Sequence, residues 1–270
     1  MAVTRRARTR FQWTAVLGLP LGLALVGAGQ ALEGGTLSSI LQPAAALIVF
    51  GGTAGAVLLG SSWAEIRQAA RSLRALVLER PVNADALVQE IVRLAGQARR
   101  NGLMSLENVV DDHADPFLRK YLMHAVDGAR PQVLRDMMEL EIQHQEEHDE
   151  APARVFEAAG GYLPTLGILG AVLGLIQTMQ HLSEPEHIGG GIAVAFVATV
   201  YGVGAANLFC LPIAARLRGR AREAARHREL MMEGILAIQD GLNPRLVDEK
   251  LRAMLAHTPA EPGQPRRRVA

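Results

Sequence analysis

Aromatic residues and cysteine are scarce in this sequence, and each shortage narrows the classes of protein it can belong to. Aromatic residues make up 4% of the 270 residues although 49% are hydrophobic, and Cys210 is the one cysteine. A single cysteine excludes an intramolecular disulfide framework and a multi-cysteine metal site. Glycine is abundant, with 27 residues, and small residues are typical of membrane helices because they let backbones approach closely. The net charge of +1 gives no reason to expect a nucleic-acid partner.

Charged residues are missing from long parts of the chain. Four stretches contain no Asp, Glu, Lys or Arg: Phe11–Leu32, Gly34–Ala64, Ala158–Ser183 and His187–Ala215. Each reaches the roughly 20 residues that a helix needs to cross a bilayer, and a charge at the centre of such a helix costs roughly 2.5–3.5 kcal/mol. A cleaved signal peptide is the alternative for the first stretch, but its apolar run exceeds the usual ~7–15 residues. The sequence therefore predicts four transmembrane helices.

Lys and Arg are also missing from the two short loops between these stretches. All 28 of them lie in residues 1–10, 61–157 and 216–270, whereas the loops contain only Glu33, Glu184 and Glu186 as charged residues. Cytoplasmic segments of membrane proteins carry the excess of Lys and Arg. We therefore predict that both termini and the long middle segment are cytoplasmic and that the two short loops face the periplasm.

The predicted fold class is an all-α integral membrane protein with four transmembrane helices and a helical cytoplasmic domain between the second and third. The predicted parts are a cytoplasmic N-terminal arm, a transmembrane hairpin, the cytoplasmic helical domain, a second hairpin, a cytoplasmic helical tail and a disordered tail. Their boundaries are 1–10, 11–60, 61–157, 158–215, 216–257 and 258–270, respectively.

Helix start and stop signals subdivide the middle segment. An apolar stripe at helical spacing predicts a first helix over Glu65–Glu79. Asn83 is expected to cap a second helix, which stops at Asn101-Gly102. Asp115-Pro116 then breaks the pattern, and Pro131 begins a long helix that continues into the third charge-free stretch. No part of this segment shows the alternation of a strand.

Basic residues gather directly after the fourth charge-free stretch. They are Arg216, Arg218, Arg220, Arg222, Arg226 and Arg228. They are expected either to dock on anionic lipid head groups, at about 1 kcal/mol for each basic residue, or merely to fix the topology. Both interpretations stay open. Asn243-Pro244 then predicts a last helix over Arg245–Ala256.

Enzyme motifs are not found in the sequence, which has no phosphate-binding loop and no His-Glu-x-x-His pattern. Gly189-Gly190-Gly191 is interpreted as a turn rather than a nucleotide loop. His144 and His148 have a spacing that can bind zinc, but a solvated helix face is the favoured interpretation. We predict no enzyme activity, no cofactor and no metal site.

The third and fourth stretches are rich in small residues and each contains one proline. Pro164 and Pro212 both fall at the predicted cytoplasmic end, and each leaves the carbonyl four residues earlier without its helical partner. A hinge or hydrated mouth is one interpretation, and a simple packing kink is the other. Because none of the stretches holds a carboxylate, the chain alone cannot carry a titrating proton through the membrane. A partner would have to supply that group.

Two motif regions resemble the MotA/PomA stator family of flagellar motors, in its PomA- and MotC-like branch. The first is ARRNGLMSLE at Ala98–Glu107, and the second covers Val155–Leu246, with YLPTLGILGAVLGLI, AVAFVATVYGVGAANLFCLPIA and ILAIQDGLNPR. The resemblance implies a ring of five copies in the bacterial inner membrane around two MotB-like partner helices. These single-span partners carry the proton-accepting Asp and anchor to peptidoglycan. The ring would drive the rotor protein FliG.

The resemblance also implies roles for charged residues in the middle segment. Arg99 and Glu107, with Arg100 beside them, stand where family members place the charges that engage FliG. Without the resemblance, the same residues would be interpreted as a solvated helix face.

The same resemblance assigns residues to the ion path. Pro164 and Pro212 match the two family prolines near its cytoplasmic mouth, and Thr199 matches a pore-facing threonine. Sodium-driven members have hydroxyls at the positions of Ala171 and Ala198, so their absence here predicts proton coupling.

Three other functions are alternatives to this one. An energy-transducing ring of the ExbB/TolQ type resembles the stator but is expected to have three spans and a periplasmic N terminus. A structural membrane scaffold without ion flow is a second alternative. A small-solute transporter is disfavoured because no polar midplane site and no inverted repeat are visible.

Overall fold

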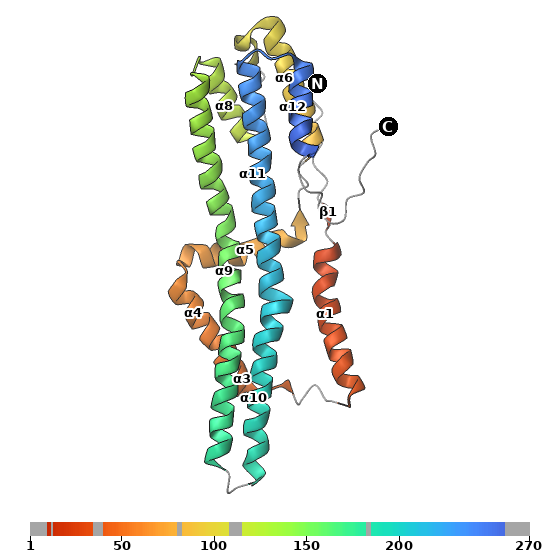
Figure 1. Ribbon diagram of the computed structural model, residues 1–270, viewed down its shortest axis with the longest axis vertical. Helices are drawn as coiled ribbons and strands as arrows, with labels where there is room; N and C mark the ends of the chain where they lie inside the picture. The colour runs from red at the N-terminus through yellow and green to blue at the C-terminus, as the bar shows by residue number, and fades with distance from the viewer. Residues whose placement is uncertain are drawn as a thin grey trace. The chain divides into compact units, whose positions relative to one another are not determined.

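The computed structural model describes residues 10–11, 13–34, 40–79, 83–107, 115–181 and 185–256, which are almost entirely helical (Figure 1). The predicted all-α class is therefore confirmed. Pro81 and the predicted tail at 258–270 lie outside the described residues. The chain divides into two compact units. The first contains Met1–Pro81 and His148–Ala221, and the second contains Val82–Glu147 and Arg222–Ala270.

The first unit contains the apolar helices. In chain order its elements are α1 (Trp13–Leu32), α3 (Pro43–Ala46), η1 (Leu47–Gly51), α4 (Gly52–Gly60), α5 (Trp63–Val77), the second half of α9 (Pro131–Gln180), α10 (Pro185–Ala205), η3 (Ala206–Cys210) and the start of α11 (Leu211–Gln239). The helices α3, η1 and α4 form one run that Pro43 opens at its first turn, a position where the missing N–H of proline has no cost.

Three helical runs among the described residues are long and apolar enough to cross a membrane. They are Pro43–Gly60 and parts of Pro131–Gln180 and Ile188–Gln239. A shorter apolar helical stretch, Pro20–Leu32, lies in α1. The predicted count of four spans therefore stays a prediction.

Helix α9 continues through both Pro152 and Pro164. One feature of the first unit differs from the sequence prediction, in which the middle segment had no strand. The start of the chain forms a minimal strand pair, in which β1 (Arg10–Phe11) lies antiparallel to β2 (Leu78–Glu79). This pairing brings the residues that precede α1 beside the end of α5.

The second unit is built from α6 (Ala84–Asn101), η2 (Leu103–Leu106), α8 (Pro116–Val126), the first half of α9, the second half of α11 and α12 (Pro244–Ala256). The predicted cap at Asn83 is confirmed, because its side chain accepts a hydrogen bond from the Ala86 N–H at 3.2 Å. Asp115, predicted only as a break in the pattern, caps α8, and its side chain accepts from the N–H groups of Phe117 and Leu118. Gly102 ends α6 with a φ of 81°, which only glycine adopts readily.

The core of the second unit joins the middle of the chain to its C-terminal helices. Fully buried side chains come from every helix of the unit, among them Leu94, Leu118, Leu134, Ile235 and Leu251. Gly234 permits the closest approach, because a Cβ there would lie 2.6 Å from Cγ2 of Ile91. The sequence patterns predicted these helices singly and gave no sign that α11 and α12 pack on α6.

Candidate functional site

Glycine brings the backbones of α9 and α10 into direct contact. A Cβ on Gly174 would lie 2.7 Å from the carbonyl oxygen of Gly191 and 2.8 Å from the amide nitrogen of Ala195. A Cβ on Gly202 would overlap the carbonyl of Leu163. Real Cβ atoms do not approach backbone atoms this closely, so no larger residue fits without moving the helices apart. The predicted close packing through small residues is confirmed.

The contacts along α9 fix the directions of its neighbours. Going back along α9, Gly174 meets Gly191, Gly170 meets Ala198 and Gly160 meets Leu211, so α10 and η3 run antiparallel to α9. The run Pro43–Gly60 is antiparallel to α9 as well. There, Gly170 meets Ile48, Leu166 meets Gly52, and Tyr162 meets Gly60. Gly60, Tyr162 and Leu211 therefore lie at the same end of the apolar helices.

The alanine and threonine positions assigned to the ion path lie on or beside this contact. Ala198 is fully buried, and its Cβ would lie 2.8 Å from a Cβ on Gly170. Thr199 is half-buried, and its hydroxyl donates to the carbonyl of Ala195 at 3.3 Å. Ala171 is half-buried and directly follows Gly170. The structure thus brings Ala198 against α9 and leaves Thr199 and Ala171 partly exposed.

The two prolines come from adjacent segments of these antiparallel helices. Pro164 leaves the carbonyl of Gly160 without a helical N–H, and Leu211, the neighbour of Pro212, packs over Gly160. The π-helical turn η3 immediately precedes this point, and the N–H of Leu211 bonds back to Ala206 rather than to residue 207. Such turns are frequent at functional sites. No pattern of residues predicts this turn, because the helix around it is apolar along almost its whole length.

An ion pair that sequence reasoning missed lies just beyond the prolines. Arg218 on α11 donates to the carboxylate of Glu157 on α9. The hydrogen bond and the charge of Glu157 raise the pKa of Arg218. Glu157 lies seven residues before Pro164 and Arg218 six residues after Pro212, so only the antiparallel arrangement reveals that they meet.

Tyr201 anchors the start of the Pro43–Gly60 run. Its hydroxyl donates to the carbonyl of Ile40 at 2.5 Å and accepts from the N–H of Gln42 at 3.3 Å. Its ring also lies 5.6 Å from that of Phe50, centroid to centroid. The Tyr201 side chain on α10 thereby satisfies two backbone groups that precede the first residue of α3.

The charged positions assigned to the rotor lie on either side of a short turn in the second unit. Arg99 and Arg100 are exposed in the last turn of α6, and Glu107 is exposed directly after η2. Gln97 donates to the carbonyl of Ser105 at 2.8 Å across this turn. Leu106 is fully buried beneath it. The turn is therefore held in place while its charges stay in water.

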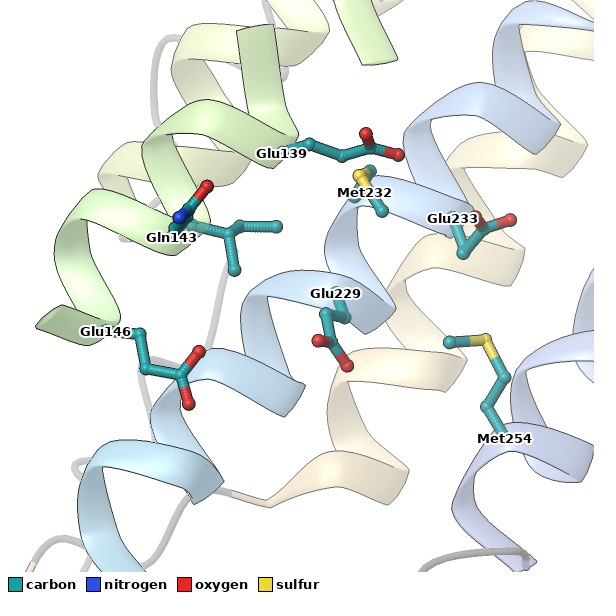
Figure 2. A pocket seen from close by; sticks show the side chains of 8 residues that line it. Glu139, Gln143, Glu146, Glu229, Met232, Glu233 and Met254 are labelled. Atoms are coloured by element: carbon teal, nitrogen blue, oxygen red, sulfur yellow. The ribbon is translucent and has the colours of Figure 1, made fainter. Parts of the chain in front are cut away.

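The second unit also has an acidic groove of about 360 Å³ between α9, α11 and α12 (Figure 2). It is lined by Glu139, Ile142, Gln143, Glu146, Glu229, Met232, Glu233 and Met254. Glu233 accepts from Arg135 at 3.0 Å and is paired with Lys250 at 2.6 Å. Burial alone would raise the pKa of Glu233, but Lys250 and Arg135 outweigh burial and lower it. The described residues contain no cluster of three or more potential metal ligands, here or elsewhere.

Comparisons with known proteins match both halves of the chain. Residues 16–102 match the motility protein A N-terminal family, and residues 109–230 match the MotA/TolQ/ExbB proton channel family. Motility protein A of Bacillus subtilis (strain 168) is 34% identical over 252 residues, which cover 92% of this chain and 91% of the relative.

Two solved structures share the fold. The structure of C. jejuni MotAB has a TM-score of 0.84 at 28% identity and covers 94% of this chain and 100% of that one. The flagellar MotAB stator complex from Bacillus subtilis has a TM-score of 0.81 at 33% identity and covers 91% and 100%. These likenesses confirm the resemblance seen in the motifs: the chain belongs to the motility protein A group of the MotA/TolQ/ExbB proton channel family.

Proposed function

We propose that this chain is a stator subunit of a bacterial flagellar motor and forms an ion channel with a MotB-type partner. The observation that carries the proposal is the likeness to two MotAB structures, which cover 94% and 91% of this chain. The charge-free stretches of the chain also contain no acid that could titrate, so a partner must supply one. Protonation of a carboxylate on the partner would move ring and partner relative to each other. Ion flow would thereby become torque. Entry of one proton supplies about 2.3 kcal/mol per 100 mV, so each step is small.

The assembly we propose is a ring of five copies around two single-span partner helices anchored to peptidoglycan. Support comes from large apolar side chains that one chain leaves exposed on α9 and α10, such as Ile168, Leu175 and Phe196, the last 72% exposed. In a membrane these side chains contact lipid or neighbouring helices, so they offer ample surface for both.

The topology we propose has four spans in the inner membrane with both termini cytoplasmic. The distribution of Lys and Arg supports it. So does the pairing of β1 with β2, because it joins the residues before α1 to the end of α5. A chain that crosses twice between these points returns to the side from which it started.

The ion path we propose passes Thr199 and the cytoplasmic mouth at Pro164 and Pro212. Sodium needs several oxygen ligands to replace its water, whereas a carboxylate and a chain of waters can pass protons. The methyl groups of Ala171 and Ala198 offer no such ligand. The coupled ion is therefore the proton.

Torque acts on FliG through Arg99, Arg100 and Glu107. Exposure of all three side chains on a fixed turn supports this assignment. An interface between charges in water is screened and reversible, which suits a contact that must form and break at every step.

The test is purification of the chain with the MotB-like protein of the same cell, followed by the mass of the complex and proton flux in vesicles. We expect five copies of this chain with two of the partner, and a proton flux that needs no sodium and needs the partner's acid. The proposal is contradicted if this chain is a monomer both when purified alone and when purified with the MotB-like protein. Proton flux through this chain alone also contradicts it. Flux that requires sodium contradicts the choice of ion.

Charge reversal at Arg99 and Glu107 separates the rotor contact from the channel. Cells with both residues reversed are expected to stop swimming while the mass of the complex and the proton flux stay unchanged. Normal swimming of the double variant would remove these residues from the rotor contact. Normal swimming after deletion of the whole chain would favour a structural scaffold.

A further inference from the structure

Helix α5 leaves the direction of the apolar helices at once. Ser61 is extended, with φ −131° and ψ 146°, and ends α4. Ser62 then caps α5, because its N–H and hydroxyl both donate to the Glu65 carboxylate at 2.8 Å, while the Glu65 N–H donates back to the hydroxyl. As a result α5 runs crosswise to the part of α9 in the same unit (Figure 1). A helix crosswise to membrane-spanning helices lies parallel to the membrane surface.

Two contacts with α9 set the depth of α5. Gly60, just before the turn, meets the hydroxyl of Tyr162, and Gln68 donates to the carbonyl of His148 at 3.1 Å. Tyr162 lies inside the charge-free stretch that begins at Ala158, and His148 lies outside it. Helix α5 therefore lies across the boundary between apolar and polar sequence, which is the level of the lipid head groups.

The exposed side of α5 carries one aromatic and two basic side chains. Trp63 is 70% exposed, and Arg67 and Arg71 follow at intervals of four residues, so all three lie on one face. Ala69, which points elsewhere, is buried. Within the described residues neither Arg67 nor Arg71 forms an ion pair. The one acid of this helix, Glu65, is occupied by Ser62, and that hydrogen bonding lowers its pKa.

This combination matches the chemistry of an anionic phospholipid. Tryptophan favours the head-group level, and guanidinium groups form paired hydrogen bonds to phosphate. Each basic residue near the surface favours anionic lipid about fivefold. Among the arginines after the fourth stretch, Arg218 fits less well because it is paired with Glu157. We propose that Arg67 and Arg71 of α5, beside Trp63, bind the head groups of anionic phospholipids in the cytoplasmic leaflet.

The test uses Trp63 as its own reporter. The chain has two tryptophans, so Trp13→Phe leaves Trp63 as the only one. The full-length variant is reconstituted with its partner in phosphatidylcholine vesicles that contain phosphatidylglycerol, and either the neutral or the anionic lipid is brominated. Brominated phosphatidylglycerol is expected to quench Trp63 much more than brominated phosphatidylcholine at the same mole fraction. The additional change of Arg67 and Arg71 to Gln should lower this preference about 30-fold.

Changing Arg222 and Arg226 to Gln removes the same charge elsewhere and serves as the matched control. Equal quenching by the two lipids, no quenching by either, or a preference that survives without Arg67 and Arg71 overturns the lipid site. The inference rests on the proposed function, because it assumes a membrane-inserted chain. Proton flux is therefore measured in the same vesicles. If the Trp13→Phe parent, with Arg67 and Arg71 in place, shows no lipid preference while its proton flux is intact, the lipid site alone is overturned. Absent flux together with an absent partner overturns the function.

Discussion

Each of the two units of this chain is stabilised internally by a different kind of contact. In the first unit, α9 and α10 meet backbone to backbone at Gly167, Gly174 and Gly202. In the second unit, large side chains such as Leu94 and Ile235 fill the space between helices. In lipid there is no hydrophobic drive to bring helices together, so close approach and dispersion must suffice. In water, burial of large side chains supplies about 25 cal/mol for each Å². Glycine in the first unit therefore serves the same purpose as leucine in the second.

The largest effect is expected where the backbone contact of the first unit is broken. Gly202→Leu places four carbons where even a Cβ overlaps the Leu163 carbonyl. Because the backbone cannot move aside as a side chain does, we expect the free energy of unfolding to fall by more than about 3 kcal/mol. Little folded protein should then be recovered. The measurement is folded yield and thermal unfolding in detergent. Gly204→Ala is the matched control, because nothing lies within 4 Å of a Cβ there. Equal effects at both positions would contradict the backbone contact.

A smaller effect is expected where a large side chain of the second unit is removed. Ile235 is fully buried, and Ile235→Ala should lower the free energy of unfolding by about 2–5 kcal/mol. Susceptibility of the second unit to limited proteolysis in urea measures the change. Leu246→Ala, at a residue 54% exposed on α12, is the control and should have little effect. A neutral result at Ile235 would mean that this core is not what stabilises the second unit.

The smallest effect is expected from the ion pairs of the second unit. The pKa of Glu233 is lowered below its ordinary value of 4.5, since Lys250 and Arg135 outweigh burial, which raises it. A lowered folded-state pKa adds stability that is present above pH 4.5 and is lost as the pH falls through the folded pKa. Glu233→Gln should therefore lower the free energy of unfolding by about 1–2 kcal/mol at pH 7. This figure allows for the weakening of the two ion pairs by solvent, because Glu233 is partly exposed.

Unfolding in urea as a function of pH tests this prediction. The difference in stability between the wild type and Glu233→Gln should shrink as the pH falls below about 4.5. Glu249→Gln, which removes an exposed carboxylate next to Lys250, should leave the profile unchanged. A difference that does not vary with pH would show that the change acts through packing rather than charge.

Local signals in the sequence predicted local structure well. Asn83, Asp115 and Gly102 were identified as helix boundaries because a cap or a left-handed residue acts within a few positions of itself. The all-α class and the apolar helices followed from periodicity and from missing charge. Helix α9 continues through Pro164, since a long apolar helix packed on its neighbours accommodates a proline that would break an isolated one.

The residues assigned to the proposed function also fall into two groups, those that the sequence predicts and those that only helix packing brings together. The motifs that contain these residues were recognised from the sequence, and so was the need for an acid from a partner. Both depend on the charge and type of individual residues, which the sequence states directly. Three contacts and placements are visible only in the folded chain: Glu157 meets Arg218, Ala198 packs on Gly170, and α5 lies crosswise with Arg67 exposed. These facts depend on pairs of residues far apart in the chain. Their meeting is set by the antiparallel packing of whole helices, which no local pattern of residues encodes.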